Sequence, residues 1–272
     1  MKKNFLTLCL LLALLLSGTA QAAAPTSVEV PIIMYHKVTK DAGQLGAFAI
    51  TPEELAADFA FLRESDYQVV TMQALIDFVL GEGKLPQNPI VLTFDDGYFS
   101  DYLYAYPLVQ QYNIPIVSSI IGHVADEYKE EPPAGIIYPH LTWPQMAEMV
   151  KSGLVEIQNH GYDLHCTRHG ATGAEKRPGE SFDAYQVRLG EDLTKLQTRA
   201  QTELGRVPNT FTYPFGAQSE DSDTALRNLG FQASLSVEGR WNTVTRGEPD
   251  CLFRMGRLIR PHGKSLERVL QK

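Results

Sequence analysis

Short apolar runs alternate with amphipathic segments along most of the chain. The apolar runs are rich in Val and Ile, as in residues 90–94, which is typical of strands buried on both faces of a parallel sheet. Between the runs, capping signals such as Thr51 followed by Pro52 and Glu54 mark the starts of helices. The expected strands are 28–35, 68–70, 90–94, 116–121, 155–158, 210–213, 233–236 and 253–255.

The amphipathic segments complete a pattern of alternating strands and helices. Such alternation predicts an α/β fold, in which a parallel sheet covered by helices closes, or nearly closes, into a distorted barrel. The pattern contains no internal repeat, and residues 123–140 and 167–180 are expected to be irregular loops. The expected helices are 51–64, 72–80, 100–112, 142–153, 181–204, 222–228 and 265–271.

The first 22 residues have the pattern of a signal peptide. Lys2 and Lys3 precede the apolar residues 6–16, a run too short to span a bilayer comfortably. Ala20 and Ala22 fit the small-x-small cleavage rule, so residues 23–272 are expected to form a single exported domain. We expect the protein to be secreted or periplasmic, without a stable membrane anchor, because no later segment is long and apolar enough.

The charge of the chain restricts its partners. The formal net charge is -8, and removal of Lys2 and Lys3 gives -8 - 2 = -10. This charge disfavours nucleic acid and is compatible with a neutral or cationic polymer. We expect a monomer. In an exported chain Cys166 and Cys251 can pair or remain two buried thiols, and the sequence does not decide between these states.

Polar residues follow the apolar run of residues 90–94 directly. Asp95, Asp96 and Gly97 can form an ordinary turn, since Asp and Gly are favoured there. However, two adjacent carboxylates at the end of a buried strand repel each other unless a cation is close. In α/β proteins the carboxyl ends of the strands carry the chemistry. These residues are therefore candidates for a metal-assisted catalytic site.

Histidines follow two other predicted strands. His160 and His165 are five residues apart, which suits a strand end followed by a loop rather than one face of a helix. Together with Asp96 they form a plausible three-ligand metal site with open positions, and Asp95 remains free beside it. His36 ends the first predicted strand and should lie on the same rim. A surface histidine pair and a core histidine are the simpler alternatives.

Two further groups lie near predicted strand ends. Tyr213 and Phe215 belong to a Pro-Gly turn, and such turns expose backbone N–H groups that can bind an oxyanion. Arg254 and Arg257 are candidates to reach Asp95 and orient it, although most arginines are solvated surface charges. The remaining histidines are interpreted as ordinary loop residues: His123, His140, His169 and His262.

These residues resemble a known family, the polysaccharide deacetylases of carbohydrate esterase family 4, which carry the NodB homology domain. The resemblance runs from about residue 31 to about residue 259, and the segment Thr-Phe-Asp-Asp-Gly at 93–97 is its most specific element. The resemblance implies a distorted (β/α) barrel in which Asp95 is the catalytic base and Asp96 is a metal ligand.

The departures from the family pattern are informative. Thr212 stands where the family has an arginine that orients the base, and the late Leu-x-His motif is missing. The two motif histidines are five residues apart, and His36 follows Met34 and Tyr35 near the start of the chain. These features resemble the circularly permuted branch that includes poly-N-acetylglucosamine deacetylases. In that branch the histidine of the first strand supplies the general acid, which implies this role for His36.

The resemblance implies an exported hydrolase that removes N-acetyl groups from an N-acetylglucosamine polymer. One divalent ion on Asp96, His160 and His165 is implied, with zinc expected and cobalt, nickel or iron compatible with the ligands. Phe215 is expected to offer its backbone N–H to the oxyanion, near Tyr213. An O-acetyl glycan esterase, a non-haem iron oxygenase and a catalytically inactive glycan-binding module remain as alternatives. The α/β alternation disfavours the oxygenase, and a simple binder needs neither the base nor the acid.

Overall fold

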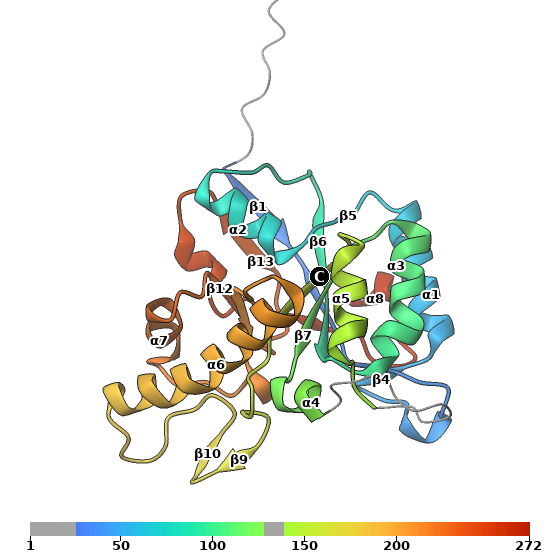
Figure 1. The fold of residues 1–272 in the computed structure, drawn as a ribbon. Coiled ribbons are helices and arrows are strands. Elements are labelled where there is room, and N and C mark those ends of the chain that lie inside the picture. The colour runs from blue at the N-terminus through green and yellow to red at the C-terminus, as the bar shows by residue number, and fades with distance from the viewer. Residues whose placement is uncertain (1–25, 128–138) are drawn as a thin grey trace, which may run out of the picture.

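The computed structural model describes residues 26–127 and 139–272 (Figure 1). The predicted signal peptide, residues 1–22, and most of the predicted loop 123–140 lie outside the described residues. The start of that loop was predicted wrongly, because Gly122–Glu127 forms helix α4. Within the described residues, no helix combines the length and the apolar character needed to cross a membrane.

The centre of the molecule is a curled parallel sheet, as predicted. Its strands follow the order β12-β11-β8-β7-β6-β2-β14, and β5 pairs with the start of β6. Parallel pairing places the carboxyl ends of these strands along one edge. The strands are β2 Ile32–Tyr35, β5 Gln68–Val69, β6 Pro89–Asp96, β7 Ile116–Ile120, β8 Val155–Asn159, β11 Thr210–Thr212, β12 Ala233–Leu235 and β14 Leu258–Ile259.

The two edges of the sheet are joined by the segment that precedes β14. Met255 forms an isolated parallel bridge with Leu235 of β12, and Leu258 of β14 pairs with Ile33 of β2. The predicted strand 253–255 was therefore wrong, since only Met255 pairs and the strand proper begins at Leu258. This connection closes the sheet into the distorted barrel that the sequence predicted.

Proline divides the first predicted strand. Pro31 lacks an N–H group, and the chain changes partners there. The residues before Pro31 form β1, which pairs antiparallel with β13, a strand that was not predicted from the sequence. The residues after Pro31 form β2, which joins the parallel sheet beside β6. The short strands outside the parallel sheet are β1 Ser27–Val30, β3 Lys37–Val38, β4 Ala49–Ile50, β9 Thr167–Arg168, β10 Ala171–Thr172 and β13 Asn242–Thr245.

Helix α1 begins after the capping residue Thr51 that the sequence indicated, and side chains cap several other helices. Thr51 and Thr142 each form a capping box, and Ser181 caps the longest helix. The single helix expected over 100–112 is instead a π-helical turn, Asp101–Ala105, followed by α3. The α-helices are α1 Pro52–Glu64, α2 Met72–Leu80, α3 Tyr106–Tyr112, α4 Gly122–Glu127, α5 Trp143–Lys151, α6 Phe182–Leu204, α7 Ser222–Asn228 and α8 Leu266–Val269.

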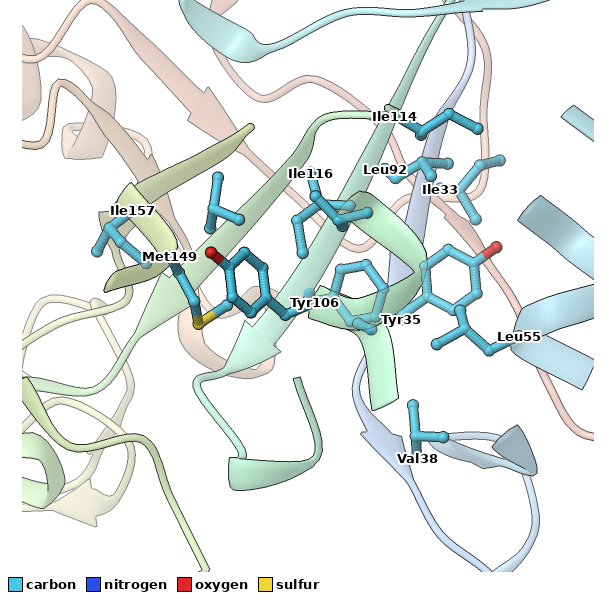
Figure 2. Close-up of a cluster of buried hydrophobic side chains, with 14 of the residues drawn as sticks. Ile33, Tyr35, Val38, Leu55, Leu92, Tyr106, Ile114, Ile116, Met149 and Ile157 are labelled. Carbon is cyan, nitrogen blue, oxygen red and sulfur yellow. The ribbon is translucent and has the colours of Figure 1, made fainter. Parts of the chain in front are cut away.

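Apolar side chains cover both faces of the sheet, which explains the continuous apolar runs in the sequence. On β6, Ile90, Leu92 and Phe94 belong to one buried cluster, while Val91 belongs to the other. Figure 2 shows the first cluster, in which sheet residues face side chains from α1, α3 and α5. The facing residues include Ile33, Leu92, Ile116 and Ile157 from the sheet and Leu55, Tyr106 and Met149 from the helices.

The two cysteines of the described residues are free thiols. The Cys166 thiol donates to the Asp163 carbonyl (3.4 Å), and the Cys251 sulfur accepts the Thr245 N–H (3.4 Å). The open question left by the sequence is thus answered in favour of two separate thiols in this structure.

An ion pair fixes the segment 167–180 to helix α6. Arg188 donates to both oxygens of Glu180 (2.7 and 2.8 Å) and thereby lowers the pKa of Glu180 from 4.5 to about 2. A carboxylate whose pKa is lower in the folded state stabilises the fold above its unfolded-state pKa. We expect the difference in unfolding free energy between wild type and Glu180→Gln to shrink as pH falls from about 4.5 toward 2. Urea unfolding across this range measures it, and a difference independent of pH would contradict the ion pair.

Candidate metal centre and catalytic site

The candidate residues meet at the carboxyl ends of four strands. His36 follows β2, Asp95 and Asp96 end β6, His160 follows β8, and Tyr213 follows β11. They line one cavity of about 530 Å³ together with His165 and Phe215. Since parallel strands end at the same edge, four distant segments of sequence contribute these residues to one site.

Three of these side chains form a compact set of potential metal ligands. Oδ1 of Asp96 lies 3.4 Å from Nε2 of His160 and 3.4 Å from Nε2 of His165. The three candidate ligand atoms lie within 4.8 Å of one another. Nδ1 of His160 donates to the Thr212 carbonyl (2.8 Å), which leaves its Nε2 free to face Asp96.

An unpartnered oxygen indicates that this set suits a cation. Oδ1 of Asp96 is buried and has no hydrogen-bond partner in the part of the chain that the structure describes. A buried carboxylate oxygen is costly unless a charge or a donor compensates it. Two imidazoles and one carboxylate are the donors that zinc and its neighbouring transition metals accept. The residues therefore fit a divalent ion.

The electrostatics of the site favour an ionised Asp96 and a neutral His165, and they favour a protonated His160 beside the two carboxylates. Burial raises the pKa of Asp96, but His160 and the other imidazoles outweigh it, so that the net pKa is lowered. Burial lowers the pKa of His165, which favours its neutral, ligating form. Burial also lowers the pKa of His160, but its interactions with Asp96 and Asp95 outweigh this and raise it overall.

The backbone of Asp96 is held in an unusual conformation. Its φ is 72°, a left-handed value that costs energy in a residue other than glycine. Nδ1 of His140 donates to the Asp96 carbonyl (3.2 Å), and the Leu141 N–H donates to the Gly97 carbonyl (2.9 Å). His140, interpreted from the sequence as an ordinary loop residue, thus contacts the backbone of a candidate ligand, and no local motif marked this contact. The ring of Tyr98, which also lines the cavity, stacks on His140.

Asp95 is engaged by a buried arginine. Nη1 and Nη2 of Arg257 donate to Oδ1 and Oδ2 of Asp95 (2.7 and 2.8 Å). Burial raises the pKa of Asp95, but the charge of Arg257 outweighs it and the net pKa is lowered. The carboxylate therefore remains ionised beside the ligand set. Thr212, at the position where the family carries an arginine, instead pairs with the Ser119 hydroxyl (2.7 Å).

Arg254, the other candidate for orienting Asp95, has a different partner. Its Nε lies 2.7 Å from Oδ2 of Asp223, and its Nη2 donates to the carbonyls of Ser219 and Glu220 (3.1 and 3.0 Å). The expectation that Arg254 reaches Asp95 was therefore wrong, because its guanidinium is held by α7 and the loop before it. Only Arg257 of the two contacts Asp95.

His36 completes the polar part of the cavity. Its Nε2 lies 3.8 Å from Oδ2 of Asp95, and its ring meets the ring of Phe48 edge-on with centroids 4.8 Å apart. Burial lowers the pKa of His36, opposed in part by Asp95 and Asp96. The geometry allows His36 to carry a proton at Nε2 within the cavity that Asp95 faces.

An aromatic turn and an apolar rim border the cavity. Phe215 has a φ of 59°, and its ring centroid lies 4.2 Å from that of His165. Tyr213 also lines the cavity, but its hydroxyl donates to Asp223 (3.0 Å) and so serves the fold. Large apolar side chains are usually buried, but the rim of this cavity has three that are exposed. The exposed fractions are 58% for Phe48, 52% for Phe215 and 44% for Val237. The rim residues Phe48 and Val237 were not predicted, because they carry no polar signature in the sequence.

The chain belongs to the polysaccharide deacetylase family. The family's sequence model matches residues 82–234, which is more than half of the chain. Among curated proteins, the chain is similar to the poly-beta-1,6-N-acetyl-D-glucosamine N-deacetylase of Escherichia coli (strain K12), with 26% identity over 226 residues. The match covers 76% of this chain and 33% of that relative, so the chain spans about a third of its length.

Solved structures give the same fold. The de-N-acetylase from Aggregatibacter actinomycetemcomitans superposes with a TM-score of 0.73 at 26% identity, covering 89% of this chain and 98% of the other. IcaB from Ammonifex degensii superposes with a TM-score of 0.68 at 27% identity, covering 86% and 93%. These similarities confirm the predicted family and the predicted barrel.

Proposed function

We propose that this protein is a metal-dependent hydrolase that removes N-acetyl groups from an N-acetylglucosamine-containing polysaccharide and releases acetate. The observation that carries the proposal is the pairing of an ionised Asp95 with an adjacent ligand set of Asp96, His160 and His165. Membership of the polysaccharide deacetylase family and the names of the relatives support the same activity.

The proposed division of labour follows from the donors. Asp96, His160 and His165 would hold one divalent ion, with zinc expected, which supplies Lewis acidity toward a carbonyl and lowers the pKa of water. Asp95, held ionised by Arg257, accepts the proton of the water that attacks the acetyl carbonyl. Arg257 also fixes both oxygens of that carboxylate, so the base has one orientation.

The leaving group requires an acid. An amine anion is a very poor leaving group, so cleavage of the C–N bond needs a proton at nitrogen. His36 lies beside Asp95 in the lining of the cavity and is the proposed donor. The backbone N–H of Phe215, in the turn that follows Tyr213, is the proposed donor to the tetrahedral oxyanion. The products are acetate and a free amino sugar, and the water supplies the added atoms.

The surface of the site suits a glycan. Sugar rings have apolar faces, and the exposed Phe48, Phe215 and Val237 offer matching apolar surface around a polar centre.

We further propose that residues 1–22 are a signal peptide and that residues 23–272 form one catalytic domain. This domain acts as a monomer outside the cytoplasm, and its polymeric substrate is not a nucleic acid.

Matched substrates test the activity. Purified protein is incubated with N-acetylglucosamine oligomers and with an O-acetylated glycan, after chelation and after addition of zinc, cobalt or nickel. We expect metal-dependent acetate release from the N-acetylated oligomers. Release from the O-acetylated glycan alone would instead identify an O-acetyl esterase, which the same machinery can serve.

Removal of one ligand should remove the metal. In His160→Ala, we expect the metal content of protein purified with zinc to fall well below one ion per chain, because a three-residue set loses its most buried imidazole. Atomic emission spectroscopy measures the content. His169→Ala, on the exposed turn at the end of β9, is the control and should retain the ion. Full metal content in His160→Ala would contradict the ligand assignment.

A further inference from the structure

The loop between the two candidate ligand histidines is held by hydrogen bonds to several of its backbone groups. The N–H of Gly161 donates to Oδ1 of Asn159 (2.8 Å), and the N–H groups of Tyr162 and Asp163 donate to Asp192 (2.6 and 2.8 Å). The carbonyls of the loop accept as well. Those of Gly161 and Tyr162 receive the N–H groups of residues 122 and 123 (3.0 and 2.8 Å).

The side chain of Asp192 binds this loop at two consecutive N–H groups. It lies on α6, about thirty residues further along the chain, and each of its two oxygens accepts from a different residue of the loop. Charged acceptors make shorter and stronger hydrogen bonds than neutral ones. The contact therefore ties the loop to the longest helix of the fold rather than to its own neighbours in sequence.

The loop is also compact on its inner side. Gly161 has a φ of 83°, and a Cβ at that position would lie 2.9 Å from Cβ of Leu164. The Tyr162 hydroxyl donates to Asp126 (2.9 Å) on α4. Since His160 is fixed by the end of β8, the path of this loop contributes directly to where His165 stands relative to it.

We infer that Asp192 is a positioning residue of the metal centre, whose carboxylate sets the course of the loop 161–164 and thereby holds His165 within reach of the ion bound by Asp96 and His160. The inference rests on the proposed function, because it requires that these three residues bind a metal. The inference explains how two imidazoles that are five residues apart can bind the same ion. The residues between them form a turn, and Asp192 of α6 holds that turn in place.

The test compares metal affinity between two variants of adjacent residues. Asp192→Asn retains size but replaces one acceptor oxygen with an NH₂ group, which faces a loop N–H. Glu191→Gln removes the same charge one residue earlier, from an exposed position on the same helix. Zinc affinity is measured by competition with a chromogenic chelator, and the cobalt-substituted proteins are compared by visible absorption. Thermal unfolding of the metal-free proteins reports the fold separately.

We expect Asp192→Asn to weaken zinc binding by about 10- to 100-fold, the range usual for groups that orient metal ligands, and to change the cobalt spectrum. Glu191→Gln should match wild type in both readouts. Asp192→Glu retains the charge but displaces it by one methylene, and it should also weaken zinc binding. It replaces Asp192→Asn in the test if that variant does not fold.

The outcomes separate the inference from the proposed function. If wild type binds no metal, the proposed function fails first. If wild type binds zinc and the folded Asp192 variants bind it equally well with an unchanged cobalt spectrum, the metal site stands and the positioning role is overturned. A lowered melting temperature with unchanged zinc affinity would likewise reduce Asp192 to a structural contact.

Discussion

Asp95→Asn is expected to lower the turnover of an N-acetylated oligomer by about two to four orders of magnitude, the usual contribution of a general base. The amide that replaces the carboxylate cannot accept the water proton, although it occupies nearly the same volume. Metal content should stay near that of wild type, because Asp96 and the two histidines are untouched. Steady-state acetate release, with metal content measured on the same preparations, gives the result.

A second buried aspartate supplies the control for this variant. Asp58 accepts from Nε and Nη2 of Arg260 (2.8 and 3.1 Å), a buried pair with the same chemistry as Asp95 and Arg257 but outside the cavity. Asp58→Asn should therefore destabilise the fold in a similar way, since it also leaves a buried guanidinium short of an acceptor. Turnover per folded molecule should remain close to wild type in Asp58→Asn. Equal losses in both variants would mean that Asp95 acts through stability and is not the base.

His36→Ala is expected to lower amide hydrolysis by about 10²- to 10⁴-fold, as for a general acid that protonates the leaving group. His36 lies beside Asp95 and lines the cavity, while the ligand set lies on other strands. The variant should therefore keep its metal and its affinity for the oligomer. The quantity to measure is kcat for an N-acetylated oligomer, together with KM and metal content.

An activated acetate ester provides the internal control for His36. Its alcohol leaves readily without a proton, so ester hydrolysis should be reduced much less than amide hydrolysis in His36→Ala. The ratio of the two losses is informative because folding, metal binding and water attack affect both substrates alike. A loss by the same factor for amide and ester would show that His36 is not the leaving-group acid.

The strand-end rule explains why much of the site could be predicted from sequence. Asp95 and Asp96 end a strongly apolar strand, His160 follows another strand of the sheet, and parallel pairing brings such ends to one edge. His165 lies one short loop further on. The same argument placed His36 on this rim, and Nε2 of His36 indeed lies 3.8 Å from Oδ2 of Asp95.

The contacts made by helices and closing segments could not be predicted in this way. The sequence offered Arg254 and Arg257 as equal candidates, because the strand expected at 253–255 gave the wrong geometry for the chain that carries them. Met255 pairs with β12, and two residues further along the chain the buried Arg257 donates to Asp95. His140 contacts the Asp96 carbonyl and Asp192 contacts the loop before His165, both from distant segments, and neither carries a local pattern that indicates such a contact.

Some predicted boundaries of strands and helices were wrong for local reasons. The apolar pattern continues across Pro31, but the pairing of β1 ends there because proline has no N–H group to donate. Hydropathy alone does not show this missing donor. The π-helical turn at Asp101–Ala105 interrupts a helix whose apolar spacing looked regular. Both irregularities adjoin the strands that carry His36 and the two aspartates.

The central claim is that this protein hydrolyses an N-acetyl amide with the help of a metal held by Asp96, His160 and His165. The most direct measurement follows acetate and new primary amine together, in the same reaction, on N-acetylglucosamine oligomers with Asp95→Asn as the inactive reference. We expect equimolar acetate and amine, loss of both after chelation, and recovery of both when zinc or another divalent metal is returned. Binding of the oligomers without acetate release under every metal tested would contradict the account and indicate a glycan-binding protein.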